Sequence, residues 1–434
     1  MKFFNPKILN SSYKLGLIGL LVVFITAVTK LVELMGTGLG PIEYVIPFAA
    51  PIMLVSIMIG PQVAFILSVF LGFLVVSFFQ FTFELFAMFL IGAFIGVFSI
   101  LRVERRSVLI RSGFLIGAGQ TLSVLFFYFL RTGKLFTTEL GFRLIWSGIN
   151  GVVVVPLLVI GLLPFLENLF NITTNFKLIE LADLNHPLLR DLFEHAPGTF
   201  QHSLMLSYLC ERAARETGAN ALLVRVASYY HDLGKGEIAE YFIENQGQKK
   251  NPHDELKPSL SASILRSHVK KGVQRAREAG LPEEIINIIE QHHGTTTMQY
   301  FYHRALEEGD GSVSEEEFQY PGPRPQTREA GICMLGDAVE AATRTLEDPT
   351  PNSIRDMIED IVYEKFKDGQ LNQCDLTLMD LDRIVNSFTR VITSIHHQRI
   401  EYPDDMDTEQ LEQMRDVGQP KENSNLGTME EDEE

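Results

Sequence analysis

The chain has 434 residues, of which 46% are hydrophobic and 21% are charged; this composition is too apolar for a disordered protein, and the length is too great for one ordinary domain. The charge is divided unevenly: residues 1–170 hold 11 Lys and Arg against 6 Asp and Glu, a net charge of +5, so the total of −17 leaves −22 for residues 171–434. This acidic balance argues against DNA or RNA as a partner, because binding to a nucleic-acid polymer needs a basic face against the phosphates.

The first 170 residues predict a bundle of about six membrane-spanning helices. Few charges interrupt the apolar run from Leu31 to Ile100, and the intervals between them approach the roughly 20 residues that a spanning helix needs. The predicted spans are residues 14–34, 42–60, 62–80, 83–101, 108–130 and 143–166. Glu84 is the main ionisable residue within them and lies near a span end, which disfavours a transporter. The lipid bilayer is therefore an expected partner.

The distribution of basic residues predicts the orientation of this bundle. They gather before the first span and between the fourth and fifth spans: Lys2, Lys7, Lys14, Arg102, Arg105, Arg106 and Arg111. Because short basic segments stay in the cytoplasm, six spans return the chain to the cytoplasm near residue 167. The loop from Arg131 to Arg143 then faces outward with a net charge of +2, in mild conflict with this rule. We expect a multi-pass protein of the cell membrane with its second half in the cytoplasm.

Residues 171–400 show the spacing of amphipathic helices, with Gly and Pro at their ends and no alternating strand pattern. The predicted fold class is therefore all-α: a polytopic transmembrane helical bundle followed by a cytoplasmic helical domain. Cys210, Cys333 and Cys374 form no CxxC pair, which excludes a disulfide framework and a cysteine zinc site. Residues 401–434 hold 13 acidic residues against two basic ones and predict a disordered acidic tail.

Histidines and aspartates on five predicted helices of the second half suggest a metal centre. A lone HisAsp dipeptide is common by chance, but here it is accompanied by further metal-ligand types. The candidate ligands are His202, His231, Asp232, His268, His292, His293 and Asp337. Inward-facing imidazoles and carboxylates on different helices can build such a site in a helical bundle. Seven ligands are too many for one metal, so we expect two divalent metals bridged by Asp232.

This arrangement resembles that of the HD-domain metal-dependent phosphohydrolases. The whole chain is most similar to the membrane-anchored phosphodiesterases of the seven-transmembrane HD family, PgpH type, which cleave cyclic di-AMP. The phrases that carry the resemblance are NHPLLR (185–190), APGTFQHS (196–203), YYHDLGK (229–235), ENQ (244–246), NPHD (251–254), EQHHGT (290–295) and YPGPRPQ (320–326). The resemblance implies an HD phosphohydrolase domain at residues 171–400.

The resemblance also implies roles for single residues. Asp232 bridges the two metals, with His202, His231 and Asp337 on one metal and His268, His292 and His293 on the other. The expected catalytic residues are Asp232 and Lys235, the latter offsetting charge on phosphate oxygens. Lys235, His253 and Arg324 are the candidate substrate contacts. The expected reaction is hydrolysis of cyclic di-AMP to linear pApA by a dinuclear enzyme. Iron or manganese suits several imidazoles better than magnesium, which prefers oxygen.

Two features depart from the family pattern. Members usually carry a large extracellular domain after a first membrane helix, but the first loop here, about Lys30 to Ile42, is far too short to hold one. Relatives that cleave cyclic di-GMP have GlyTyrPro after the HisHis pair, whereas residues 294–297 are GlyThrThrThr, which favours cyclic di-AMP.

The alternatives are another HD hydrolase activity, on a guanosine alarmone or a nucleotide, and a membrane signal receptor without catalysis. The sequence leaves the oligomeric state open and allows a homodimer.

Overall fold

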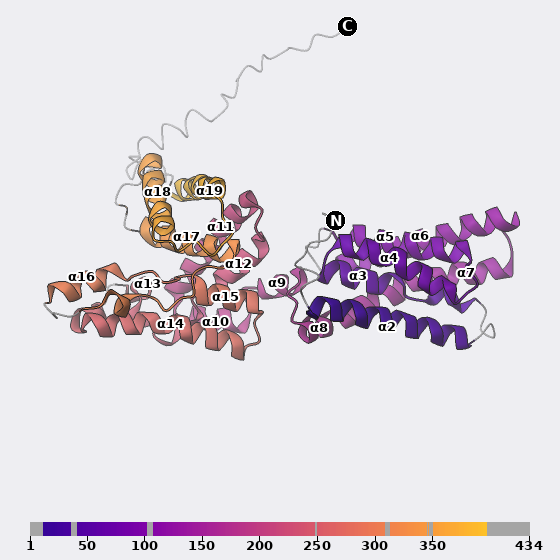
Figure 1. Ribbon diagram of the computed structural model, residues 1–434, viewed down its shortest axis with the longest axis horizontal. Helices are drawn as coiled ribbons and strands as arrows, with labels where there is room; N and C mark the ends of the chain where they lie inside the picture. Colours follow the sequence, from indigo (N-terminus) through magenta and orange to yellow (C-terminus); the bar gives the residue numbers. More distant parts are fainter. Residues whose placement is uncertain are drawn as a thin grey trace, which may run out of the picture.

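The structure is a computed structural model that describes residues 12–35, 41–101, 107–247, 250–308, 313–344, 346 and 350–396. Within these ranges the secondary structure is helical, apart from one isolated bridge between Thr297 and Gln319. The helices form two bodies placed end to end, an N-terminal bundle and a C-terminal domain (Figure 1). The predicted all-α fold class is therefore confirmed. The acidic tail predicted at 401–434 lies outside the described residues.

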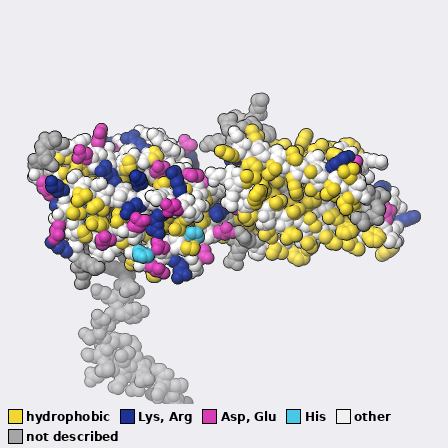
Figure 2. All heavy atoms as spheres, turned by 90° about the horizontal axis from the view of Figure 1, so that it is seen from below, with side chains coloured by type: hydrophobic (Ala, Val, Ile, Leu, Met, Phe, Trp, Pro, Cys, Tyr) yellow, Lys and Arg dark blue, Asp and Glu magenta, His cyan; other side chains and the backbone are white. Residues whose placement is uncertain are grey.

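The N-terminal bundle consists of apolar helices that match the predicted segments in order. They are α2 (Ser12–Met35), η2 (Ile42–Val45) with α3 (Ala49–Met58), α4 (Pro61–Ser77), α5 (Phe83–Ser99), α6 (Ser107–Thr132), and α7 (Thr138–Ile149), which continues through the π-helical turn η3 (Asn150–Val154) into α8 (Val155–Phe170). By length and composition, three of the helical segments can cross a membrane, Ser12–Met35, Ser107–Thr132 and Thr138–Phe170, and three shorter ones are apolar. Apolar side chains cover this body, whereas charges of both signs cover the other (Figure 2).

Helix boundaries in the bundle differ from the prediction in one loop. The loop expected from Arg131 to Arg143 is shorter, because α6 continues to Thr132 and α7 begins at Thr138. The hydroxyl of Thr137 caps α7 by accepting a hydrogen bond from the backbone N–H of Leu140 at 3.1 Å. This cap satisfies a backbone donor that would otherwise be unpaired, and it fixes the early start of the helix.

A polar cluster joins three segments at one end of the bundle. The hydroxyl of Tyr44 in η2 donates to Oε1 of Glu84 at 2.7 Å, and Nη1 of Arg143 donates to the same oxygen at 2.8 Å. Nη2 of Arg143 also pairs with Glu139 at 2.5 Å. A buried carboxylate in an apolar bundle is costly unless it is paired. Arg143, the last residue of the predicted 131–143 loop, therefore neutralises Glu84.

The short helix α9 (Asn175–Leu181) connects the two bodies. Phe176 packs into the core of the N-terminal bundle, whereas Leu178 and Leu181 pack into the core of the C-terminal domain. The hydroxyl of Tyr230 donates to the carbonyl of Leu181 at 2.8 Å, which ties α9 to the helix that precedes the HisAsp dipeptide.

The C-terminal domain has one main apolar core and a smaller separate one, formed by Ala262, Phe301, Ala305 and Phe318. Its α-helices are α10 (Pro187–His195), α11 (Pro197–Thr217), α12 (Ala221–Tyr230), α13 (Ile243–Gln246), α14 (Pro258–Glu278), α15 (Glu283–Gln291), α16 (Gln299–Glu307), α17 (Arg328–Thr343), α18 (Pro351–Lys367) and α19 (Leu378–His396). Short 3-10 turns η4 (Leu233–Glu237), η5 (Ala239–Tyr241), η6 (Pro252–Glu255) and η7 (Glu315–Phe318) complete it. The predicted ligands lie within or directly after helices α11, α12, α14, α15 and α17.

Candidate metal centre

The seven predicted ligands come from five helices and meet in one buried place. His202 and His268 lie within α11 and α14, and Asp337 lies within α17. The other ligands follow helix ends, where the chain leaves its helical path: His231 and Asp232 follow α12, and His292 and His293 follow α15.

Two glycines allow the helix ends to approach the centre. Gly294 has φ +54° and ends the turn after α15, so that both adjacent imidazoles reach the site. Gly234 in η4 lies against α14: a Cβ atom added there would be 1.9 Å from the carbonyl oxygen of His268. Only glycine permits this close contact, which brings the HisAsp dipeptide beside His268.

Asp232 lies between two pairs of imidazoles. Its Oδ2 is 3.0 Å from Nε2 of His231 and 3.9 Å from Nε2 of His202. Its Oδ1 is 3.4 Å from Nε2 of His268 and 3.8 Å from Nε2 of His292. Each carboxylate oxygen therefore faces a different pair, which is the arrangement expected of a bridging carboxylate.

Backbone carbonyls orient three of the imidazoles. Nδ1 of His231 donates to the carbonyl of Ser228 at 2.8 Å, and the corresponding bonds of His268 and His292 to Leu265 and Ile289 are 2.5 and 2.7 Å. Because a carbonyl only accepts, the Nδ1 atoms carry the protons and the Nε2 lone pairs point into the centre. Such bonds orient metal-binding histidines and fix their tautomer.

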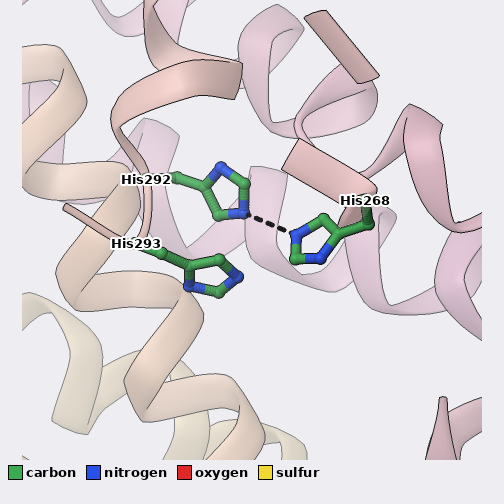
Figure 3. Close-up of side chains that lie close together, drawn as sticks. All are labelled: His268, His292 and His293. Atoms are coloured by element: carbon green, nitrogen blue, oxygen red, sulfur yellow. Dashed lines mark hydrogen bonds between the residues drawn. The ribbon is translucent and has the colours of Figure 1, made fainter. Parts of the chain in front are cut away.

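The Nε2 atoms face one another at distances that suit shared coordination. Nε2 of His202 and Nε2 of His231 are 3.3 Å apart, and those of His268 and His292 are 3.5 Å apart. The rings of His268, His292 and His293 turn toward a common point (Figure 3). Among the described residues, the groups able to hold a metal ion are His202, His231 and Asp232, and His268, His292 and His293.

Asp337 lies against both groups. Its Oδ1 is 3.1 Å from Nε2 of His202, and its Oδ2 is 3.6 Å from Nδ1 of His293. The family resemblance assigns Asp337 to the group of His202 and His231 alone. The structure places it between that group and His293, so it can complete either group of ligands.

The protonation of the ligands fits cation binding. Burial lowers the pKa of His268 to about 4 and that of His292 to about 3, so both are neutral at pH 7 and can act as ligands. Burial would raise the pKa of Asp232, but its interactions with His231 and Lys235 outweigh burial and hold the pKa well below its usual range. Neither Asp232 oxygen accepts a well-oriented hydrogen bond, although Lys235 is close to one of them. A buried carboxylate in this state suits a metal partner.

Carboxylates around His202 favour positive charge at that position. Burial alone would lower the pKa of His202, but its hydrogen bonds to Asp337 and Glu340 outweigh burial and raise the pKa to about 10. Nδ1 of His202 donates to Oε2 of Glu340 at 2.5 Å. A metal cation would supply this positive charge when the ring gives up its proton.

Three further residues surround the centre and are not among the predicted site residues. Glu340 orients His202, and it lies one helical turn after Asp337, a spacing that could have pointed to it. The ring of Tyr320 stacks on His293, with centroids 4.1 Å apart and an interplanar angle of 26°. Oε1 of Glu244 lies 3.0 Å from Nζ of Lys235. Both Tyr320 and Glu244 belong to phrases quoted above.

The three predicted substrate contacts lie in different settings. Nζ of Lys235 is 2.7 Å from Oδ2 of Asp232, directly beside the centre. Arg324 supports the loop after His293, because its Nε donates to the hydroxyl of Thr295 at 3.1 Å. His253 bonds within its own region of the chain, because its Nε2 donates to the carbonyl of Tyr241 at 3.0 Å. These bonds give Arg324 and His253 structural roles, and their contact with substrate stays a prediction.

In comparisons with known proteins, each half of the chain matches a family model. Residues 1–174 match the family described as a 7TM receptor with intracellular HD hydrolase, and residues 199–342 match the HD domain. The chain is 37% identical over 410 residues to the cyclic-di-AMP phosphodiesterase PgpH of Bacillus subtilis (strain 168), covering 93% of this chain and 56% of that protein. It is 37% identical over 372 residues to PgpH of Listeria monocytogenes serotype 1/2a (strain 10403S), covering 85% of this chain and 52% of that protein.

The chain thus spans about half the length of the curated relatives it matches. Among solved structures, it is similar to the PgpH HD domain of L. monocytogenes in complex with cyclic-di-AMP, with 43% identity, coverage of 49% of this chain and 99% of that chain, and a TM-score of 0.48.

Proposed function

The chain belongs to the family of 7TM receptors with an intracellular HD hydrolase, and from this premise we propose that it is a metal-dependent phosphodiesterase that hydrolyses cyclic di-AMP to linear pApA at the membrane. The observation that carries the proposal is the buried centre in which Asp232 faces two pairs of imidazoles. The names of the two PgpH relatives support cyclic di-AMP as the substrate.

The residues of the centre have separate tasks in this reaction. When bound, a pair of divalent metals would acidify a water molecule and offset the negative charge of the phosphodiester. Asp232 would join the two metals, and the backbone-bonded imidazoles would keep the ligand atoms in place. Lys235, whose ammonium lies beside Asp232, would contact a non-bridging phosphate oxygen and offset charge that develops there.

We propose iron or manganese as the native metals. Five imidazoles and two carboxylates make a nitrogen-rich set of donors, and magnesium prefers an oxygen environment. His253 and Arg324 are proposed to line the nucleotide pocket further from the metals.

The chain is proposed to cross the membrane six times within residues 1–170, with the HD domain at 171–400 in the cytoplasm. Six alternating spans require the segments near residues 42, 84 and 143 to lie on the same, outer side. The hydrogen bonds that join Tyr44, Glu84 and Arg143 at one end of the bundle support this topology. The homodimer that the sequence allows stays a prediction, and sedimentation in detergent tests it.

The direct test uses the full chain purified in detergent. We expect cyclic di-AMP to be converted to pApA, and the activity to disappear with a chelator and return with iron or manganese. A panel containing cyclic di-GMP, the guanosine alarmone and nucleoside triphosphates separates the other HD activities. Turnover of the alarmone without turnover of cyclic di-AMP would replace the proposed substrate. Absence of both bound metal and turnover would favour a receptor without catalysis.

A further inference from the structure

A short segment with its own hydrogen bonds lies beside the metal centre, on α13. The ENQ phrase at residues 244–246 is one of those quoted for the family resemblance, yet none of its residues was assigned a role. In the structure, Gln246 ties the segment to its flanking residues, because its Nε2 donates to the carbonyl of Glu240 at 3.1 Å and to Oδ1 of Asn251 at 3.3 Å. Glu244 and Asn245 make contacts with more distant parts of the chain.

The segment docks on the first turn of α11. Oδ1 of Asn245 accepts from the backbone N–H of Thr199 at 3.1 Å, and its Nδ2 donates to the Thr199 hydroxyl at 2.9 Å. A Cβ atom added at Gly198 would be 1.9 Å from the carbonyl oxygen of Glu244, so the two backbones lie in close contact. This docking fixes the position of α13, and with it the direction of the Glu244 side chain.

Glu244 shares Lys235 with the bridging carboxylate. Nζ of Lys235 is 2.7 Å from Oδ2 of Asp232 and 3.0 Å from Oε1 of Glu244, and it lies 4.7 Å from the ring centroid of Phe242. The Lys235 and Glu244 side chains are only 12% and 10% exposed. The hydroxyl of Thr199 also donates to Oε1 of Glu244 at 3.0 Å, so the carboxylate is itself held in place.

The two carboxylates beside Lys235 differ in whether they can stay paired with its ammonium once metals are bound. The oxygens of Asp232 face the imidazole pairs that form the proposed metal sites. An ammonium near two divalent cations is repelled by them, and this repulsion is strong in a buried setting. Glu244 lies outside the set of ligands, and its negative charge attracts Lys235. It is therefore the partner that can hold the ammonium at the edge of the centre.

We infer that Glu244 is a positioning residue, which holds Lys235 where its ammonium meets a phosphate oxygen of the substrate. This inference rests on the proposed phosphodiesterase function. Glu244 acts through Lys235 and coordinates no metal, so its loss removes an oriented charge and leaves the ligand set intact.

The test is a double-mutant cycle on the full chain in detergent, with Glu244→Gln, Lys235→Met and the combined variant. We expect each single variant to lower kcat/KM by roughly 10- to 100-fold, the range seen when groups that orient a site are removed. Because Glu244 acts through Lys235, the double variant should be no worse than Lys235→Met within about threefold. Glu244→Asp, which retains the charge, should recover part of the loss.

Two further measurements separate positioning from a structural effect. Metal content per chain should be unchanged in Glu244→Gln, and cyclic di-AMP should bind the metal-free variant more weakly than the metal-free wild type, measured by calorimetry. Glu240→Gln is the matched control, because it makes the same chemical change on an exposed side chain four residues before Glu244. It should lower kcat/KM much less than Glu244→Gln.

Independent, multiplicative effects of the two single variants would overturn the inference, as would loss of metal in Glu244→Gln or an equal loss of kcat/KM in Glu240→Gln. Failure of the proposed function has a different signature. If the wild type cleaves another phosphodiester and leaves cyclic di-AMP intact, the substrate is wrong, and the same cycle on the cleaved substrate still tests Glu244.

Discussion

Asp232 is the residue on which both halves of the proposed metal centre depend. One of its oxygens faces His202 and His231, and the other faces His268 and His292. Replacing it with Asn keeps the volume but removes the charge and one ligand oxygen. We expect Asp232→Asn to lower the metal content from about two ions per chain to less than one, and to abolish turnover of cyclic di-AMP.

Elemental analysis of the purified chain and a product assay check this prediction. Asp360→Asn is a suitable control, because Asp360 is an exposed carboxylate on α18. An Asp232→Asn protein that keeps both metals would show that Asp232 does not bridge them.

Glu340 is expected to strengthen metal binding through its hydrogen bond to His202. It accepts the Nδ1 proton of His202 at 2.5 Å and is itself paired with Arg344 at 2.8 Å. Carboxylates in this position raise the basicity of the imidazole and fix its orientation, and their loss typically costs about 10- to 100-fold in metal affinity or activity. Glu340→Gln should therefore weaken metal binding by that factor, measured by competition with a coloured chelator. A metal affinity equal to that of the wild type would contradict this role.

At the residue level, the types of the candidate ligands can be predicted from the sequence, whereas the residues that support them cannot. His202, His268 and Asp337 stand out because imidazoles and carboxylates on apolar helix faces are rare. Glu340 does not stand out, because a glutamate on a helix usually faces solvent. Its role depends on how closely α11 and α17 pack, and single-sequence patterns contain no such distance.

At the scale of elements, the contact between η4 and α14 decides whether the ligands meet. Gly234 lies so near α14 that an added Cβ would be 1.9 Å from the His268 carbonyl oxygen and 2.6 Å from the backbone nitrogen of Gly272. Backbone atoms cannot yield as a side chain can. We expect Gly234→Ala to destabilise the domain by roughly 1–3 kcal/mol or more, the cost of overpacking a core, and to reduce metal content.

Gly236→Ala is the matched control for this prediction within the same turn. Its added Cβ would meet the end of the flexible Arg275 side chain at 3.1 Å, which can move aside. Thermal unfolding of both variants in detergent should show a clear loss only for Gly234→Ala. Equal unfolding temperatures would mean that η4 and α14 can separate without cost.

The existence of the helices could be predicted from the sequence more reliably than the positions of their ends. The end of α15 could be predicted from the sequence, because Gly294 follows it and glycine commonly ends helices; its φ is +54°. The start of α7 could not, because the Thr137 cap lies in a polar stretch that resembles a loop. A local cap decides such a boundary, whereas apolar periodicity only shows that a helix exists.

At the scale of the whole molecule, the distribution of cysteines offers a clean test of topology. Residues 1–170 contain no cysteine, and the three native cysteines are buried in the C-terminal domain. An introduced cysteine in the membrane half is therefore the principal reactive thiol in a folded chain. Six spans place residues 107 and 134 on opposite sides of the membrane, with 107 in the cytoplasm and 134 outside.

We therefore expect Lys134→Cys to react with a membrane-impermeant maleimide in intact cells. Ser107→Cys should react only after permeabilisation. Both side chains are exposed in the structure, so a difference between them reports on the bilayer and not on burial, and the unsubstituted chain gives the background from native thiols. Labelling of both positions in intact cells, or of Ser107→Cys alone, would contradict the proposed orientation. Labelling of Ser107→Cys alone would also place the HD domain on the wrong side for a cytoplasmic substrate, because an even number of spans leaves the start of α2 and the end of α8 on the same side.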